Sequence, residues 1–455
     1  MKMCWMVASM LLAVSTVASG EEVPAWTSRV DAIVDTIAKD GPGATVAVSQ
    51  GGRIVYAQAR GLASMELGVP METGSVLRIG SLTKTITAAS ILRLQAQGRI
   101  DLDARLSTWL HGFPHAKDIT VRELLTHTSG VSDGWDVPLT DVLDTPGLVR
   151  HIGSVPLDFA PGTDWRYSNS GYMLLGALLE KITGKPWYQA ENDLVLAPLG
   201  LTHTGFHDDA AIVPRMASGY SVDAAGKVVR PVAYSISGPG AAGGMTSTAS
   251  DIAMLLHGMA TGNVPGRQAF QAMSTPARIG DVDLPYGMGM VPGTLRGTAV
   301  VEHSGGIEGY SAHYVYLPGE DIAVAVLENS DAPTWLARSL AHRIAATVMG
   351  RPYRFFAAKA WSASSLGAVA GTYAIKDGGC HAVVVKNGSA WIRRDDGPQR
   401  KLDAASDDVL VYAGDGIDYL RPERDRSGAV TGLEFHADGA DTGRVERRVA
   451  ACKGP

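Results

Sequence analysis

The stretch Ile79-Gly80-Ser81-Leu82-Thr83-Lys84 opens a long apolar segment that continues to about Gln97. Apolar residues recur in this segment at helical spacing and predict a buried helix that ends at Gly98. A helix places positions i and i+3 on one side, so the side chains of Ser81 and Lys84 are expected to touch. A serine hydroxyl becomes an effective nucleophile when an adjacent base removes its proton, and a partly buried lysine can be that base. The stretch therefore predicts a nucleophile and a base on one helix.

The composition is typical of a large globular protein. The chain has 455 residues, of which 45% are hydrophobic, and a formal net charge of -6. This length allows two or three domains, and the absence of a basic cluster argues against nucleic acid as a partner. We expect no cofactor and no metal, because the sequence lacks the patterns H-E-x-x-H and C-x-x-C and its histidines are scattered.

The first twenty residues predict a secretory signal peptide. Lys2 supplies a positive start, residues 6–17 form a short apolar run, and Ala18-Ser19-Gly20 offers small residues for cleavage. The apolar run is too short for a confident membrane span, and no other segment has that length and character. We therefore expect an exported protein, periplasmic or secreted, without a stable membrane span after cleavage. A retained N-terminal anchor is the alternative.

Strand-like runs stand at both ends of residues 21–350, with helical patterns between them. Residues 44–49 and 53–59 predict a hairpin, and three more strand-like runs lie within residues 299–328. The simplest packing is one antiparallel sheet built from both ends, flanked by helices, with a helical subdomain. The predicted fold class is therefore α/β, of the α+β kind.

The remaining residues predict a second, smaller domain. Residues 351–365 have the character of a linker, and residues 366–455 contain short strand-like runs separated by turn signals. This pattern predicts a small all-β barrel or sandwich. Cys380 and Cys452 both lie in this domain, and we expect them to form a disulfide in an oxidising compartment.

Two further short motifs follow the serine-lysine pair. Tyr167-Ser168-Asn169 offers a hydroxyl that can shuttle a proton and an amide that can bind a substrate carbonyl. His303-Ser304-Gly305-Gly306 follows a strand-like run, where glycines would let a substrate lie against the strand edge. Residues 130–134 also match G-x-S-x-G, but a helix rather than a strand precedes them, so we interpret them as a loop.

The order S-x-x-K, Y-x-N and H-x-G, on helix, loop and strand, resembles the penicillin-recognising serine hydrolases. This family comprises class C β-lactamases, D-Ala-D-Ala carboxypeptidases, D-aminopeptidases and their esterase relatives. Residues 124–130, 167–176 and 243–248 are also similar to the family, and the resemblance covers about residues 25–350. The C-terminal part is similar in kind to the lipocalin-like β domains that some members carry.

The resemblance implies a role for each motif residue. Ser81 would be the acyl-accepting nucleophile, and Lys84 and Tyr167 would handle protons, with either of them as the general base. Asn169 would hold the substrate and orient Lys84. The backbone N–H groups of Ser81 and Gly306 would form the oxyanion hole.

His303 departs from the family's β-lactamases, which usually carry a lysine at this place. An imidazole is only partly charged near neutral pH, and this weakens the case for binding the carboxylate of a penicillin. His303, Gly305 and Gly306 are the further substrate-binding candidates, beside Asn169. The sequence therefore favours an exported serine hydrolase, an esterase or D-peptidase rather than a dedicated β-lactamase, with a small molecule or peptide as substrate. The alternative is a non-catalytic cell-wall peptide-binding protein or scaffold of the same fold; the physiological substrate and the oligomeric state stay open.

Overall fold

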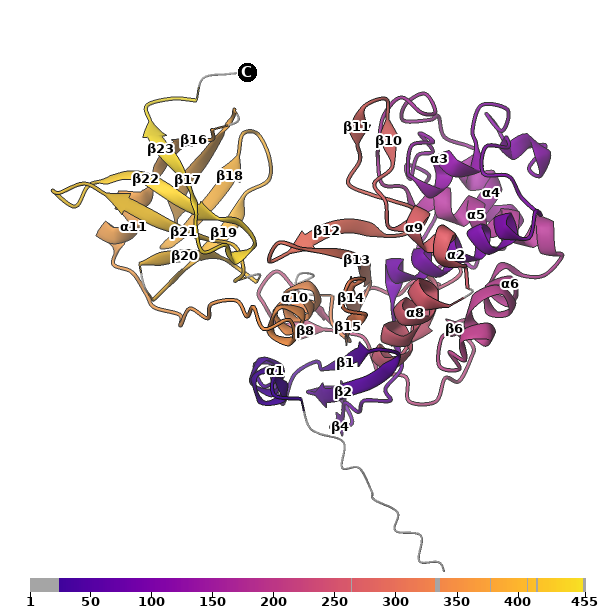
Figure 1. Ribbon diagram of the computed structural model, residues 1–455, viewed down its shortest axis with the longest axis horizontal. Coiled ribbons are helices and arrows are strands. Elements are labelled where there is room, and N and C mark those ends of the chain that lie inside the picture. Colours follow the sequence, from indigo (N-terminus) through magenta and orange to yellow (C-terminus); the bar gives the residue numbers. More distant parts are fainter. Residues whose placement is uncertain are drawn as a thin grey trace, which may run out of the picture.

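The computed structural model describes residues 24–262, 264–331, 336–376, 378–406, 408–414 and 416–452. Figure 1 shows a larger part of mixed helices and strands and a small barrel of strands near the C-terminus. The predicted fold class is confirmed, because the larger part contains an antiparallel sheet with helices and the smaller part is a closed barrel. The predicted signal peptide, residues 1–20, lies outside the described residues.

In the larger part, the helices α2 to α6, which span residues 83–191, follow one another without a strand between them, and one further helix precedes the barrel. The helices are α1 (Thr27–Val34), α2 (Thr83–Ala96), α3 (Val121–Leu125), α4 (Thr145–Ile152), α5 (Asn169–Thr183), α6 (Trp187–Glu191), α7 (Gly240–Gly243), α8 (Ala249–Thr261), α9 (Arg267–Met273), α10 (Leu336–Val348) and α11 (Ala363–Val369). A short 3-10 turn, η1 (Gly80–Leu82), leads directly into α2.

The strands form one central sheet, several short pairs and the barrel. The central sheet contains β1 (Ala44–Gln50), β2 (Arg53–Arg60), β12 (Val291–Leu295), β13 (Thr298–Ile307), β14 (Tyr310–Leu317) and β15 (Ile322–Glu328). The short strands are β3 (Leu62–Ser64), β4 (Val69–Pro70), β5 (Leu77–Arg78), β6 (Gly205–Phe206), β7 (Ser221–Val222), β8 (Val228–Val229), β9 (Met245–Ser247), β10 (Arg278–Ile279) and β11 (Val282–Asp283). The barrel contains β16 (Gly371–Ala374), β17 (Cys380–Lys386), β18 (Ser389–Arg394), β19 (Arg400–Ala405), β20 (Val409–Tyr412), β21 (Tyr419–Arg424), β22 (Val430–His436) and β23 (Arg444–Val449).

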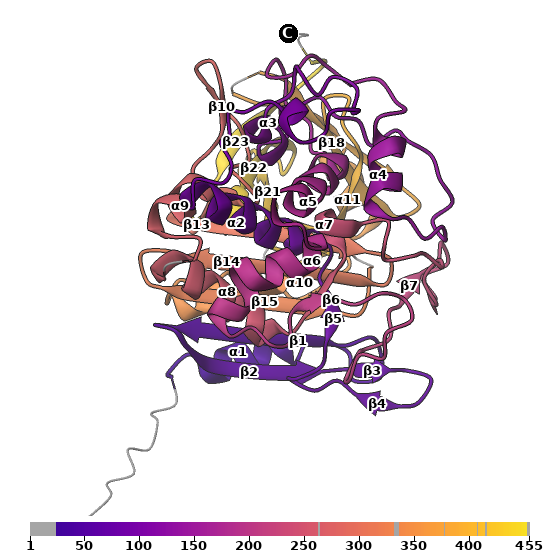
Figure 2. The same cartoon turned by 90° about the vertical axis from the view of Figure 1, so that its right-hand side faces the viewer.

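The two ends of the larger part meet in the central sheet, as predicted. The strand order is β12-β13-β14-β15-β1-β2, and all neighbours are antiparallel. Successive side chains point to opposite faces of a strand, so Val46 packs in the core beneath α1 and α10, whereas Ala47 packs in the core with α2 and α8. Figure 2 looks onto the sheet from the side of α2, α5 and α8. Both faces of the sheet are covered here, so β1 and β15 are buried almost throughout.

Helix α2 lies in the middle of this packing and is buried on nearly all sides. It contacts α5, α7 and α9, which is why its apolar residues are not confined to one stripe. Gly98, with a φ of +68°, follows the end of the helix as predicted. The start differs from the prediction, because Ser81 lies in η1 and the α-helix itself begins at Thr83.

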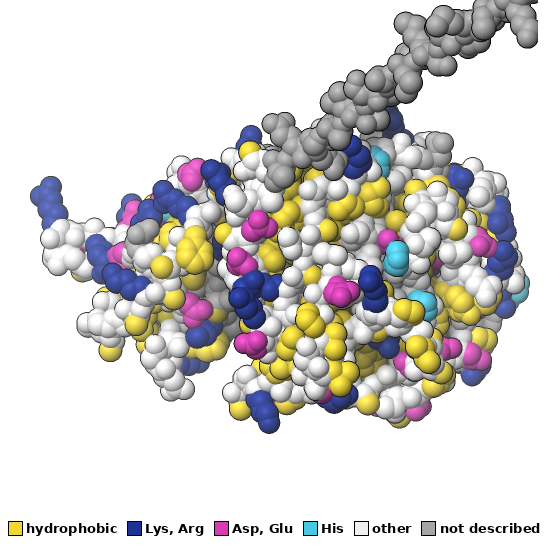
Figure 3. All heavy atoms as spheres, turned by 90° about the horizontal axis from the view of Figure 1, so that it is seen from below, with side chains coloured by type: hydrophobic (Ala, Val, Ile, Leu, Met, Phe, Trp, Pro, Cys, Tyr) yellow, Lys and Arg dark blue, Asp and Glu magenta, His cyan; other side chains and the backbone are white. Residues whose placement is uncertain are grey.

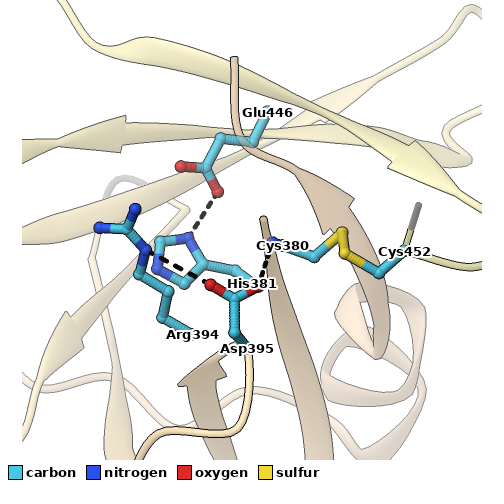
Figure 4. The surroundings of a disulfide bond; sticks show 6 residues. All are labelled: Cys380, His381, Arg394, Asp395, Glu446 and Cys452. Atoms are coloured by element: carbon cyan, nitrogen blue, oxygen red, sulfur yellow. Dashed lines mark hydrogen bonds and ion pairs between the residues drawn. A yellow bond between two sulfur atoms is a disulfide. The ribbon is translucent and has the colours of Figure 1, made fainter. Parts of the chain in front are cut away.

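The barrel is closed, with its eight strands in sequence order. We did not predict β19 and β23, because at least half of the side chains in each are polar and only one side of each strand faces the barrel core. The predicted disulfide between Cys380 and Cys452 is present. Figure 4 shows it beside the buried pair of His381 and Glu446, whose Nδ1 and Oε2 atoms are 2.7 Å apart.

The barrel packs against the α10 side of the larger part (Figure 1). The backbone N–H of Arg296, in the turn between β12 and β13, donates to the Asp438 carboxylate of the barrel, and Arg343 of α10 donates to the carbonyl of Gly416. The segment that joins the two parts leads into α11, a helix that we did not predict.

Two further features concern the length of the helices and the charge of the surface. Within the described ranges, no helix has both the length and the apolar character needed to cross a membrane. Figure 3 shows acidic and basic side chains interspersed over one face of the molecule.

Candidate active site

The structure brings Ser81 and Lys84 together at the junction of η1 and α2. The Nζ atom of Lys84 lies 3.0 Å from the Oγ atom of Ser81. Thr83 fixes the local backbone, since its hydroxyl donates to the carbonyl of Gly80 at 2.8 Å and accepts from the N–H of Met245 at 3.2 Å. The turn that carries Ser81 is therefore fixed by the hydrogen bonds of Thr83 to Gly80 and Met245.

Lys84 is completely buried, and its amine has three oxygen partners. Besides Ser81, these are Oδ1 of Asn169 at 2.8 Å and the carbonyl of Ala242 at 2.7 Å. Burial lowers the pKa of Lys84 to about 7, against the opposing effect of the Asp133 carboxylate. A neutral amine has two N–H donors and one lone pair. The two amide-type oxygens can accept those donors while the Ser81 hydroxyl donates to the lone pair, so the geometry suits a base that takes the serine proton.

Tyr167 and Asn169 come from the segment that opens α5. Asn169 is the first residue of the helix, and Ser168 caps it by accepting from the N–H of Gly171 at 3.1 Å. The centre of the Tyr167 ring lies 4.9 Å from Nζ of Lys84. Burial raises the pKa of the Tyr167 hydroxyl, so this group is protonated at neutral pH.

Asp133 is a site residue that the sequence reasoning missed. Residues 130–134 form a loop, as predicted, and the carboxylate of Asp133 accepts from the N–H groups of Asn169 at 2.9 Å and Ser170 at 2.8 Å. Its Oδ2 also lies 3.3 Å from the side-chain amide of Asn169. An acid at a helix N-terminus is favourable, but the loop and the helix are 36 residues apart, so no local signal pairs them.

The ring of His127 packs against the ring of Tyr167. Its ring centre lies 4.4 Å from that of Tyr167 and 4.5 Å from that of Tyr286. Its Nδ1 accepts from the N–H of Ser168 at 3.1 Å. Burial, together with the positive charge of Lys84, places the pKa of His127 well below its usual value, so the imidazole is neutral.

His303 lies on β13 and is also buried and neutral. Its Nε2 pairs with the hydroxyl of Tyr286 at 2.8 Å, and its Nδ1 pairs with the carbonyl of Ser304 at 2.7 Å. A carbonyl can only accept, so Nδ1 carries the hydrogen and Nε2 accepts from Tyr286. Burial and the nearby Lys84 lower the pKa of His303 to about 3. The residue at the place of the expected lysine therefore brings no positive charge to the site.

Glycines let β13 approach the η1 turn closely. A Cβ atom on Gly305 would lie 2.0 Å from the carbonyl oxygen of Ile79, and one on Gly80 would lie 2.7 Å from the backbone nitrogen of Gly306. A Cβ atom on Gly306 would meet nothing within 4 Å. The backbones of η1 and β13 are thus in contact beside Ser81, while Gly306 faces open space.

A cavity of about 810 Å³ opens over these groups. Ser81, Asn169 and Gly306 line it. Its apolar side is made by Trp135, Val137, Pro138, Leu139, Leu143, Met173 and Ile307. Five acids also line it, namely Asp133, Asp136, Asp141, Glu308 and Asp331. Among the described residues that line this cavity there is no lysine or arginine, and none comes from the barrel.

None of the groups around Ser81 forms a metal-ligating cluster within the described part of the chain. The one such group found there consists of Glu302, His313 and His342. Since Glu302 precedes His303 in β13, the two side chains point to opposite faces of the sheet.

Comparison with known proteins identifies the family. A family model described as Beta-lactamase matches residues 30–349. This chain belongs to the Beta-lactamase family. The matched range contains every catalytic and substrate-binding candidate named above and ends before the barrel begins. The chain is therefore a β-lactamase-related serine hydrolase.

Three similar proteins show the range of this family. Esterase EstB of Burkholderia gladioli is 34% identical over 273 residues, which cover 50% of this chain and 68% of the esterase. A D-aminopeptidase of Gluconobacter oxydans is 25% identical over 343 residues, which cover 72% of this chain and 63% of the relative. The crystal structure of a D-amino acid amidase from Ochrobactrum anthropi aligns with a TM-score of 0.62 at 25% identity, over 71% of this chain and 99% of the amidase.

Proposed function

We propose that this protein is an exported serine hydrolase that forms an acyl-enzyme at Ser81. Its substrates are uncharged or cationic esters and D-amino-acid amides or peptides, and β-lactams are poorer substrates. The charge of the site supports this substrate class. Of the described residues that line the cavity over Ser81, five are acids and none is a lysine or arginine, and the imidazole of His303 is neutral.

The reaction follows from the contacts of Ser81. Lys84 takes the hydroxyl proton while Oγ attacks the acyl carbonyl, and the resulting oxyanion faces the backbone N–H groups of Ser81 and Gly306. The tetrahedral intermediate collapses, the alcohol or amine leaves with a proton from Lys84, and the acyl group stays on Oγ. Water then hydrolyses this ester with the same groups in reverse roles. Tyr167 lies close enough to relay the proton to the leaving group.

The pKa values support Lys84 rather than Tyr167 as the general base. The Lys84 pKa of about 7 makes roughly half of the amine neutral at neutral pH. The raised pKa of Tyr167 keeps its hydroxyl protonated there. Tyr167 is therefore suited to donate or relay a proton, and Lys84 to remove one.

The relatives and the sequence support the remaining parts of the proposal. Proteins named as an esterase and as a D-aminopeptidase are among the relatives, in agreement with a preference for esters and D-amino-acid substrates. The N-terminal signal pattern supports export. The disulfide in the barrel supports the same conclusion, because such bonds persist in oxidising compartments. The eight antiparallel strands of the barrel support its likeness to lipocalin-like domains.

A matched pair of substrates tests the charge argument. D-phenylalanine p-nitroanilide has a free amine, and its N-succinyl derivative has a carboxylate with the same leaving group. We expect kcat/KM at least tenfold higher for the amine, and measurable turnover of p-nitrophenyl esters. Faster hydrolysis of the succinyl derivative, or efficient hydrolysis of benzylpenicillin, would contradict the proposed substrate class. Absence of any turnover would favour a peptide-binding protein of the same fold.

A further inference from the structure

Three metal-ligating side chains converge on the far side of the sheet from Ser81. Glu302 comes from β13, His313 from β14 and His342 from α10, and their ligand atoms all lie within 4.8 Å of one another. Both histidines direct Nε2 at the same carboxylate oxygen of Glu302. The distances to this Oε2 atom are 2.5 Å from His342 and 3.4 Å from His313.

One of these ligand atoms has only a long contact. The side chain of His313 is only 2% exposed, and within the described residues its Nε2 makes no hydrogen bond and has the Glu302 carboxylate, at 3.4 Å, as its ion-pair partner. Its Nδ1 is occupied, because it pairs with the hydroxyl of Ser304 at 2.9 Å. A buried imidazole nitrogen with no hydrogen bond and only this long contact is poorly satisfied, and a cation bound between it and the carboxylate would satisfy both groups.

The chemistry of the cluster matches a transition-metal ion. Two imidazoles and one carboxylate are a ligand set that zinc uses, with metal-ligand distances of about 2.0–2.2 Å. Neighbouring ligand atoms then lie about 3.3 Å apart in a tetrahedral site. The 3.4 Å between His313 and Glu302 already has this spacing, and the 2.5 Å between His342 and Glu302 must open by less than 1 Å.

The surroundings supply an outer partner and one opposing charge. The hydroxyl of Ser304 can accept the Nδ1 hydrogen of His313, which would orient the imidazole for binding through Nε2. Arg338 lies 3.8 Å from the other carboxylate oxygen of Glu302, and its side chain is 32% exposed. The guanidinium is therefore at the solvent side of the cluster, where water and salt screen its repulsion of a cation.

We propose that Glu302, His313 and His342 bind one divalent transition-metal ion, for which zinc is the best match. The ion joins β13, β14 and α10. Because β13 also carries Gly306, the ion would fix this strand from the face of the sheet opposite to Ser81. It takes no part in the chemistry at Ser81 and acts by stabilising the folded protein.

The test is zinc binding by tag-free, chelator-stripped protein. Zinc is titrated in competition with a chromophoric chelator, and cobalt(II) is used in parallel for its visible ligand-field bands. We expect one equivalent of zinc with submicromolar affinity, a rise in melting temperature on adding zinc, and cobalt bands of a low-coordinate nitrogen and oxygen site. A wild-type protein that binds zinc no more tightly than about 10 μM would overturn the proposal.

Variants locate the ion. The substitutions His313→Asn and His342→Gln should each abolish tight binding, and Ser304→Ala should weaken it by about tenfold or more through the outer contact. His257→Gln is the matched control, because His257 pairs with one carboxylate, Asp321, at 2.9 Å and should bind as the wild type does. Folding is checked by circular dichroism, and Ser304→Ala decides the case if the histidine variants fail to fold. Binding that survives these substitutions would place the ion elsewhere and overturn the proposal.

Discussion

Replacing Asp133 by asparagine should move the acidic limb of the pH–rate profile for acylation to lower pH. The acidic limb reports protonation of the base, because only neutral Lys84 can take the proton of Ser81. The carboxylate of Asp133 favours the charged form of Lys84 and so raises its pKa. Removing that charge lowers the pKa and leaves more of the amine neutral in acid.

The contacts set the size of the effect. The amide of Asn169 separates the two charges, with 3.3 Å from Asp133 to its nitrogen and 2.8 Å from its oxygen to Lys84. The charges are thus at most about 8 Å apart, which corresponds to about 2 kcal/mol at an effective dielectric constant of 20. Asp133 is exposed, and screening by solvent reduces the shift to about one pKa unit. Starting from a pKa of about 7, the relative rate at pH 6 should rise about fivefold, with little change at pH 8.

The assay is the rate of fluorophosphonate labelling between pH 5 and 9, each profile being normalised to its own plateau. Normalisation matters because the substitution also removes a hydrogen bond at the start of α5 and can lower the plateau. Asp136→Asn is the control, since Asp136 lines the same cavity and is not among the charges that shift Lys84. An acidic limb that stays in place or moves to higher pH would refute Lys84 as the base.

Four more substitutions test separate contacts. Gly305→Ala should lower the free energy of unfolding by more than about 3 kcal/mol, because its Cβ would lie 2.0 Å from a backbone carbonyl. Gly306→Ala, whose Cβ would meet nothing within 4 Å, should leave stability unchanged and slow the hydrolysis of bulky substrates. Equal urea midpoints for the two variants would contradict this. Tyr286→Phe removes the donor to His303 and should cost about 1–3 kcal/mol in urea unfolding, and an unchanged midpoint would argue against that hydrogen bond. Cys380→Ser should destabilise the barrel by up to about 4 kcal/mol. Hydrolysis of small esters should persist, since none of the described residues that line the cavity over Ser81 comes from the barrel. Loss of barrel stability together with loss of ester hydrolysis would contradict this independence.

Local patterns predicted much of the frame. The hairpin of β1 and β2 follows from the two strand-like runs at residues 44–49 and 53–59. The approach of Ser81 and Lys84 follows from helical spacing alone, even though Ser81 lies in the 3-10 turn just before α2. These features depend on residues close in sequence, so local sequence patterns are enough to predict them.

The electrostatics of the site could not be predicted in the same way. Asp133 affects Lys84 only because a loop folds onto the start of α5. The neutrality of His303 depends on burial and on Tyr286, which reaches it across the fold. In the barrel, β19 escaped prediction because a strand with a polar outer face carries few apolar residues. Each of these outcomes is decided by contacts between distant segments.

The intact mass of the protein after reaction with a fluorophosphonate would show directly whether Ser81 is an activated nucleophile. We expect a single adduct on the wild type, mapped by peptide analysis to Ser81, and none on Ser81→Ala. Lys84→Met should fold and also fail to react at neutral pH, because it lacks the base. An adduct that persists on Ser81→Ala, or rapid labelling of Lys84→Met, would contradict the claim that Lys84 activates Ser81 as the nucleophile.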